Sequence, residues 1–197
     1  MAITPYAPDP TREAMAYHEA GHVVHASLLK LRASRVSIVP EYGGPDELDS
    51  YGHALFPRFP AWARRGRASP GRVQLLVQRY IGMIAAGGIA ETHYAGDSEG
   101  GWARARSDRE RMYDLAGLVC RASDEADAYV AWLVVRTRHV VTGEISWRII
   151  EAVATALLHH GTLSGRAIRR TIAGAYEAIW REAEVNVAAS VTAAPSD

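Results

Sequence analysis

The stretch His18-Glu19-Ala20-Gly21-His22 matches the pattern H-E-x-x-H. Its two histidines can bind one ion only if this segment and the residues around it form a helix. Side chains four residues apart lie on the same face of an α-helix, so both imidazoles can then reach one ion. With 8 His in 197 residues, the pattern is expected by chance only about 0.02 times in this chain. The stretch therefore predicts a helix that carries a metal site.

The neighbouring residues extend this helix in both directions. Apolar residues recur at helical spacing and would form its buried side: Val23, Val24, Leu28 and Leu31. Upstream, Asp9-Pro10 is a favourable start, with Asp9 as N-cap and Pro10 in the first turn. We expect a helix over residues 11–32.

Two short strands are predicted directly after this helix. Apolar and polar residues alternate over residues 35–40, and residues 52–57 read as a second strand after a loop rich in glycine. The two strands would pair as a hairpin with a long loop. Residues 56–69 hold several Pro, Gly and Arg residues, and we expect an exposed loop there.

The remainder of the chain reads as helices over residues 69–94, 108–121, 124–140, 145–160 and 164–184. Glycines at 82, 87 and 88 weaken the first of these and are expected to permit close packing. A glycine-rich loop spans residues 95–104, after which Ser107 and Glu110 match a capping box. Gly161 and Ser164 are a helix stop and a helix start.

These elements predict a mainly α (α+β) fold with a small β-hairpin beside the H-E-x-x-H helix. No repeat or linker divides the chain, so residues 1–197 are expected to form a single domain. The small, polar residues 186–197 are expected to form a disordered tail.

Composition excludes several classes of function. The formal net charge is zero, which argues against nucleic acid as a partner. The only lysine, Lys30, lies among leucines and not in a phosphate-binding G-x-x-x-x-G-K-S/T loop. The longest apolar run, residues 80–90, is shorter than the about 20 residues needed to cross a membrane. The start of the chain has no signal pattern, and we expect a cytoplasmic protein without a membrane span.

The H-E-x-x-H pattern matches the chemistry of zinc. Zn²⁺ accepts two neutral imidazole nitrogens and, in a catalytic site, typically takes a third protein ligand and a water. Glu19 follows the first histidine directly and would take a proton from that water and later deliver one to a leaving amine. A third ligand must come from elsewhere in the chain.

Local sequence alone leaves the third ligand open. His25 continues the same helix face, but three residues on one rigid helix do not converge on one tetrahedral ion, so it is expected to line a pocket or support a ligand. The other histidines are individually weak candidates. Asp108 follows the glycine-rich loop in the first turn of a helix, although the helix dipole favours an acid there in any case.

Several segments together resemble the peptidase domain of the FtsH-type zinc metalloproteases. Residues 17–24, Tyr-His-Glu-Ala-Gly-His-Val-Val, are similar to that family's peptidase motif. Further segments resemble the family in the same order: residues 36–40 with 52–57, residues 86–91, residues 105–108, and residues 156–158 with 163–168. The similarity covers residues 13–174.

The resemblance implies the site residues. Ala105-Arg106-Ser107-Asp108 is similar to the family's A-x-N-D segment, whose Asp is the third zinc ligand, so the ligands would be His18, His22 and Asp108. Glu91, in the segment similar to A-G-R-x-A-E, is a fallback ligand or would orient a ligating histidine. Glu19 would be the catalytic base and acid of a zinc-dependent metalloendopeptidase.

The chain also departs from the family pattern. Ser107 replaces an Asn, Gly88 replaces an Arg, and the family's membrane anchor and AAA+ ATPase are not seen in this sequence. We therefore expect a stand-alone form that cleaves peptides or unfolded proteins, or one that works with a separate ATPase. A homo-oligomer is compatible with the family's rings. Two alternatives remain: a non-enzymatic FtsH-like module that docks on a separate ATPase, and a different small stand-alone H-E-x-x-H peptidase.

Overall fold

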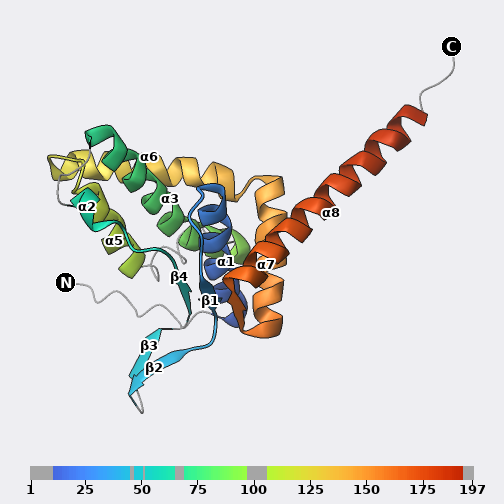
Figure 1. The fold of residues 1–197 in the computed structure, drawn as a ribbon, viewed down its shortest axis with the longest axis horizontal. Helices are drawn as coiled ribbons and strands as arrows, with labels where there is room; N and C mark the ends of the chain where they lie inside the picture. The colour runs from blue at the N-terminus through green and yellow to red at the C-terminus, as the bar shows by residue number, and fades with distance from the viewer. Residues whose placement is uncertain (1–10, 45–46, 51, 65–68, 97–105, 193–197) are drawn as a thin grey trace.

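The computed structural model describes residues 11–44, 47–50, 52–64, 69–96 and 106–192. The described chain is mainly helical with a small antiparallel sheet, as the sequence predicts (Figure 1). The helices are α1 (Arg12–Leu28), α2 (Ala61–Arg64), α3 (Pro70–Ala95), α5 (Arg106–Ala116), α6 (Ser123–Val141), α7 (Glu144–His160) and α8 (Gly165–Thr192). The strands are β1 (Arg35–Ser37), β2 (Glu41–Gly44), β3 (Glu47–Ser50), β4 (His53–Leu55) and β5 (Thr162–Ser164).

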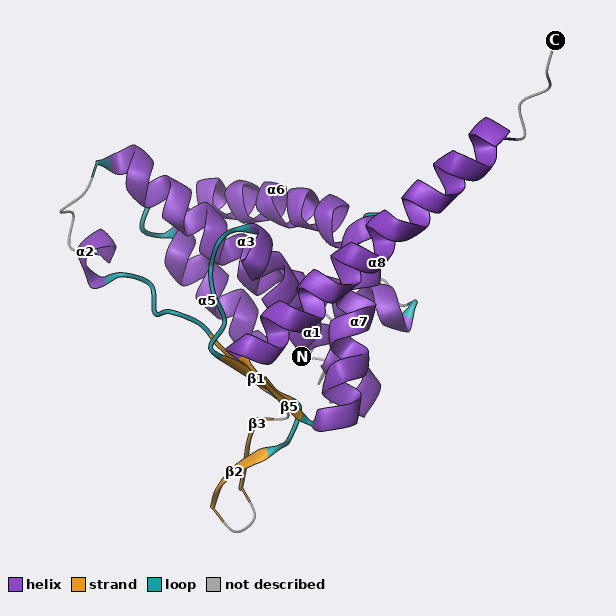
Figure 2. Cartoon of the chain, turned by 45° about the vertical axis from the view of Figure 1, so that its right-hand side comes forward, coloured by secondary structure: helices purple, strands orange, loops and turns teal. Residues whose placement is uncertain are grey.

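Helix α1 lies at the centre of the helical body, where it packs most extensively against α3 and next against α7 (Figure 2). Close approach to α3 depends on Gly21. A Cβ atom there would lie 2.7 Å from the Cβ of Ala90 and would collide with the carbonyl oxygen of Ala86. The glycine of the H-E-x-x-H stretch therefore brings the two helices together along the segment that carries the histidines.

Both predicted ends of α1 need correction. The helix begins at Arg12 with Thr11 as N-cap, and the Thr11 hydroxyl accepts a hydrogen bond of 3.1 Å from the amide of Ala14. Asp9 lies outside the described residues and is not the N-cap. The helix ends at Leu28 because Lys30 takes a left-handed conformation with φ 58°, and the amide of Leu31 turns back to the carbonyl of Ala26.

The predicted strand pair is confirmed as β1 and β4, which run antiparallel with Val36 opposite Ala54. Strand β5 is not predicted; it pairs with the other side of β1 and places Val36 opposite Leu163. The predicted loop between β1 and β4 contains β2 and β3, a separate two-stranded hairpin. Strands of three or four residues are too short to show a clear alternation, and their pairing comes from the tertiary structure.

Several predicted helix boundaries are confirmed and others are wrong. Gly161 ends α7 with φ 70°, and the Ser164 hydroxyl caps α8 by accepting from the amide of Ala167. The capping box is wrong: α5 begins at Arg106, one residue before Ser107, and Glu110 accepts a hydrogen bond from Arg106 instead.

Three further boundaries differ from the prediction. Helix α5 ends at Ala116, five residues short of the predicted limit, and α2 lies within the predicted loop. Helix α8 continues to Thr192, so the predicted disorder is wrong for residues 186–192. Alanine-rich sequence sustains that helix, since alanine has the highest helix propensity. Residues 193–197 and most of the glycine-rich loop lie outside the described residues.

Helix α3 is the one described helix that is long and apolar enough to span a membrane by length and composition. Its apolar window is 72% buried against the rest of the protein. Burial of this extent is also what the central helix of a folded core shows, so the length test does not by itself indicate a membrane span.

Candidate metal centre

Three side chains from two separate helices converge on one point. The Nε2 atoms of His18 and His22 lie 3.0 Å apart, and Asp108 Oδ2 lies 3.4 Å and 3.3 Å from them. Among the described residues, this is the group of His, Cys, Asp and Glu whose ligand atoms come close enough to hold one ion. Ligand atoms around a tetrahedral ion with metal–ligand distances of about 2.0–2.1 Å lie about 3.3–3.4 Å apart. The two distances to Asp108 Oδ2 match that spacing, and the distance between the two Nε2 atoms is about 0.3 Å shorter.

The hydrogen bonds of the two histidines leave the Nε2 atoms free for a metal ion. His22 Nδ1 lies 2.9 Å from the backbone carbonyl oxygen of Met83, and His18 Nδ1 lies 2.9 Å from Glu91 Oε2. A carbonyl oxygen and a carboxylate accept hydrogen bonds, so each Nδ1 carries the proton. In the neutral rings both Nε2 atoms then hold lone pairs, which face each other and a carboxylate oxygen. A cation between them would stabilise such a cluster of acceptors.

In the absence of a metal ion, a proton supplies part of that positive charge. Burial lowers the pKa of His18, but hydrogen bonds to Asp108 and Glu91 outweigh it and raise the pKa to about 10. Burial raises the pKa of Asp108, but the hydrogen bonds to His18 and His22 hold it well below its usual range. The carboxylate is therefore ionised and ready to bind a cation.

Helix α3 forms the wall behind the two histidines. Glu91 is 2% exposed, and its bond to His18 fixes the orientation of that ring. Gly87 faces the rings directly: a Cβ atom there would lie 2.9 Å from His18 Nε2 and would collide with His22 Nε2. The predicted close packing at Gly87 is confirmed, and its effect is to keep space open around the ligand atoms.

Asp108 enters the site from the first turn of α5, which packs against α3. Its Oδ2 faces the histidines, while its Oδ1 lies 3.7 Å from Arg111 Nη1 one turn further along the helix. The positive end of a helix favours a carboxylate in this position. Asp108, and not Glu91, completes the group, because Glu91 contacts the Nδ1 side of His18.

Glu19 is buried beside the metal group without being part of it. Its side chain is 4% exposed, and Oε2 has no hydrogen-bond partner. Burial raises its pKa, although the nearby His22 and His18 oppose that effect. A buried carboxylate with an unused oxygen costs stability unless another group binds it, which is typical of functional sites.

One further histidine acts on this carboxylate. His53, which its sequence context marks only as a weak candidate, lies in β4, and its charge acts electrostatically on Glu19 and opposes the rise in the pKa of that residue. Its place beside Glu19 results from the packing of β4 against α1, which the residue spacing does not reveal.

Tyr17 belongs to an aromatic cluster beside the metal group. Its ring stacks on Tyr94 with centroids 4.0 Å apart and on Trp147 at 5.4 Å, and His93 meets Trp147 edge-on. These ring contacts pack α1, one residue before His18, against the end of α3 and the start of α7.

His25 faces a different part of the protein. It lines a cavity of about 210 Å³ between α1, α3 and α6, and a Cβ on Gly82 would lie 3.2 Å from its Nε2. Burial lowers the pKa of His25 to about 4, so the ring is neutral near neutral pH. His25 lines a pocket, as expected, but it is not part of the group that could hold an ion.

A scan of the sequence against protein-family models finds no match, and no curated protein matches it. The likeness to FtsH-type peptidases therefore remains a prediction that rests on the segments quoted above. The geometry of His18, His22 and Asp108 is an independent observation.

Proposed function

We propose that the protein is a zinc-dependent metalloendopeptidase with the fold of an FtsH-type peptidase domain. The observation that carries this proposal is the convergence of His18 Nε2, His22 Nε2 and Asp108 Oδ2 at 3.0–3.4 Å, next to the buried Glu19. Two imidazoles and one carboxylate form a donor set that suits Zn²⁺. The unused oxygen of Glu19 supports a catalytic role over a purely structural one.

The chain's own residues divide the catalytic work. Zinc at this site would supply a water of lowered pKa and polarise the scissile carbonyl. Glu19 would accept a proton from the attacking water and deliver it to the amine that leaves when the C–N bond breaks. Glu91 and the Met83 carbonyl would hold the two imidazoles in their ligating orientation.

Strand β4 is the candidate binding edge for the substrate. The three-stranded sheet has the order β4-β1-β5, so β4 lies at one edge of that sheet. Its His53 lies close enough to Glu19 to influence that carboxylate. An extended peptide that adds to β4 would be held mainly through its backbone, with little sequence preference.

This mode of binding requires an extended substrate. Peptides and unfolded protein segments meet that requirement directly, whereas a folded protein would need a separate unfoldase such as an AAA+ ATPase. We place the activity in the cytoplasm as part of the same proposal.

The proposal is tested with the zinc-loaded chain and a fluorescently labelled unfolded protein. We expect cleavage that a chelator abolishes and zinc restores. Glu19→Gln should reduce cleavage by about 10²–10⁴-fold while zinc stays bound. Glu13→Gln is the matched control, because Glu13 is an exposed glutamate on the same helix. Equal cleavage by the Glu19 variant would refute the mechanism.

A further inference from the structure

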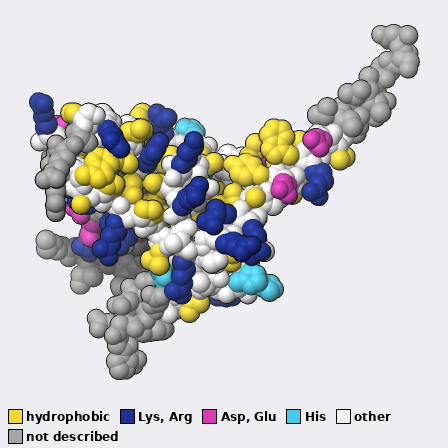
Figure 3. Space-filling model, in the orientation of Figure 1, with side chains coloured by type: hydrophobic (Ala, Val, Ile, Leu, Met, Phe, Trp, Pro, Cys, Tyr) yellow, Lys and Arg dark blue, Asp and Glu magenta, His cyan; other side chains and the backbone are white. Residues whose placement is uncertain are grey.

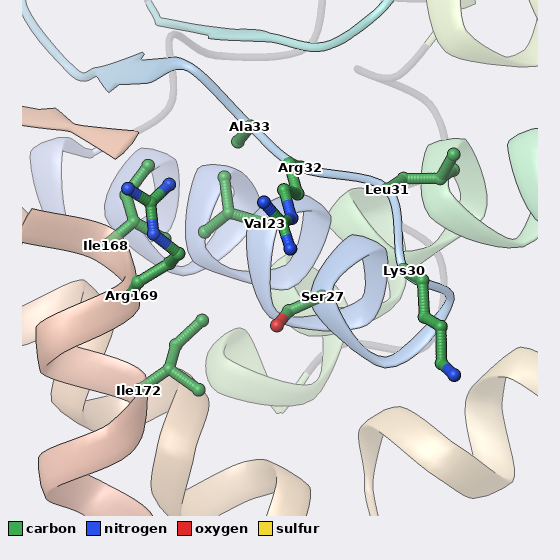
Figure 4. A pocket seen from close by; sticks show the side chains of 9 residues that line it. All are labelled: Val23, Ser27, Lys30, Leu31, Arg32, Ala33, Ile168, Arg169 and Ile172. Carbon is green, nitrogen blue, oxygen red and sulfur yellow. The ribbon is translucent and has the colours of Figure 1, made fainter. Parts of the chain in front are cut away.

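A groove of about 360 Å³ lies between α1, the segment that leaves it and the start of α8 (Figure 4). None of its lining residues belongs to the metal group. The volume falls within the range of about 300–1,000 Å³ that is typical of small-molecule sites. The groove is therefore a second place where this protein could hold a ligand.

The walls of the groove are fixed by backbone hydrogen bonds. The amide of Leu31 bonds to the carbonyl of Ala26 at 2.8 Å, which closes the end of α1. The amide of Gly165 bonds to the carbonyl of Ser34 at 2.7 Å, and a Cβ on Gly165 would lie 2.7 Å from the carbonyl oxygen of Ala33. This close approach ties the connecting segment to the start of α8, so the groove exists before any ligand binds.

The groove has an apolar floor and a cationic rim. Val23, Ile168 and Ile172 are buried and form the floor. Lys30, Arg32 and Arg169 line the rim and are exposed, and Figure 4 shows Arg32 and Arg169 reaching toward the groove from two different walls. The hydroxyl of Ser27 adds one neutral polar group.

The positive charge of the rim has no acidic partner in the part of the chain that the structure describes. No Asp or Glu lines the groove, and within the described part of the chain none forms an ion pair with Lys30, Arg32 or Arg169. Figure 3 shows Lys and Arg side chains over the middle of this face, beside the start of α8. The chain as a whole is neutral, so this concentration of charge is local.

We propose that the groove binds a small anionic amphiphile, with a carboxylate or phosphate head on Arg32 and Arg169 and an apolar tail on Val23, Ile168 and Ile172. Guanidinium groups bind both kinds of head through charge-assisted hydrogen bonds. The tail would pack against the side chains of the floor and complete their burial. This site is independent of the proposed peptidase activity.

The test is a titration of the isotope-labelled protein with octanoate and with octyl phosphate, followed through the methyl signals of valine and isoleucine in NMR spectra. We expect saturable shifts at Val23, Ile168 and Ile172. Acetate and inorganic phosphate lack the tail and octanol lacks the charge, so each should bind about tenfold more weakly or worse. The same shifts with and without a zinc chelator separate the groove from the metal group.

Charge variants at exposed positions complete the test. Arg32→Gln and Arg169→Gln should each weaken octanoate binding about tenfold. Arg136→Gln is the matched control, because Arg136 lies over the Trp132 ring on α6, away from the groove, and its loss should leave binding unchanged. Equal weakening by all three variants, or inorganic phosphate binding as tightly as octyl phosphate, would overturn the proposal.

A second experiment with vesicles of acidic phospholipid tests whether the anionic head belongs to a small molecule or to a membrane lipid. Binding of monomeric octanoate that depends on Arg32 and Arg169 supports a small-molecule site, whether or not vesicles also bind. Recruitment to vesicles without any binding of the monomeric amphiphiles would overturn the proposal and indicate a membrane-contacting face.

Discussion

The Nε2 atoms of His18 and His22 lie 3.0 Å apart, although both rings have their Nδ1 protons bonded to oxygen atoms on α3. Two lone pairs at that distance repel unless a positive charge lies between them. Asp108, on α5, places its Oδ2 atom 3.4 Å and 3.3 Å from these two nitrogen atoms. The three helices thus bring together a group that could hold a cation, and the following predictions test that proposal.

Gly87→Ala should abolish zinc binding while the protein remains folded. The new methyl group would collide with the His22 ring and lie 2.9 Å from His18 Nε2. Alanine is otherwise favoured over glycine in a helix by about 1 kcal/mol, so the helix itself does not suffer. The measurement is bound zinc per chain after dialysis, with circular dichroism as the check on folding.

The control for this variant is Gly71→Ala on the same helix, where a Cβ would meet nothing within 4 Å. It should bind zinc like the unmodified chain. Full zinc occupancy in Gly87→Ala would contradict the assignment of the site.

Glu91→Ala should weaken zinc binding by about 10–100-fold, since the acceptor that orients His18 is lost. Glu91→Gln keeps an oxygen acceptor and should lose less affinity. Competition with a chromophoric chelator measures both. Glu110→Ala removes an exposed glutamate that pairs with Arg106 and should have no effect. If Glu91→Ala bound zinc with unchanged affinity, the orienting role would be wrong.

Zinc binding should release a proton and strengthen as the pH rises. His18 is protonated in the metal-free protein below a pKa of about 10 and must lose that proton to ligate. The apparent affinity should therefore rise about tenfold per pH unit between about pH 7 and 9. Calorimetry in buffers of different ionisation enthalpy counts the protons. An affinity that does not change with pH would be inconsistent with a protonated His18.

Glu19→Gln should stabilise the metal-free protein at neutral pH. Burial raises the pKa of Glu19, so its ionised form is disfavoured in the folded state. The ionised Glu19 carboxylate does not destabilise the fold below about pH 4.3, the pKa of Glu in the unfolded chain. Its destabilising effect grows as the pH rises above that value and is complete once the pH exceeds the raised pKa of the folded state. A gain of about 1 kcal/mol would raise the midpoint of thermal unfolding by about 2–4 °C.

The comparison of melting curves for Glu19→Gln and the unmodified chain at neutral and acidic pH measures this effect. The difference should vanish on acidification. A lower midpoint for the variant at neutral pH would mean that Glu19 supports the fold.

The elements that sequence predicts well are those with strong local signals. Gly161 and Ser164 mark their helix boundaries because a positive φ and a side-chain cap are local requirements. The H-E-x-x-H spacing places His18 and His22 on one face for the same reason. Local sequence made Asp108 one candidate and the resemblance to a family singled it out, because its approach to the histidines depends on how α5 packs on α3.

The features that sequence misses depend on tertiary structure. Strand β5 gains its conformation from pairing with β1, and three residues carry no periodic signal. Lys30 follows α1 in a left-handed conformation that glycine normally takes, so no residue type there signals the end of the helix. His53 reaches the surroundings of Glu19 through the packing of β4 on α1.

The most direct test of the central claim is a crystal structure of the zinc-loaded protein with anomalous diffraction measured at the zinc edge. The account predicts one strong peak per chain, about 2.0–2.1 Å from His18 Nε2, His22 Nε2 and a carboxylate oxygen of Asp108. A zinc-soaked crystal with no peak at this position, or with a peak that Asp108 does not contact, would contradict it.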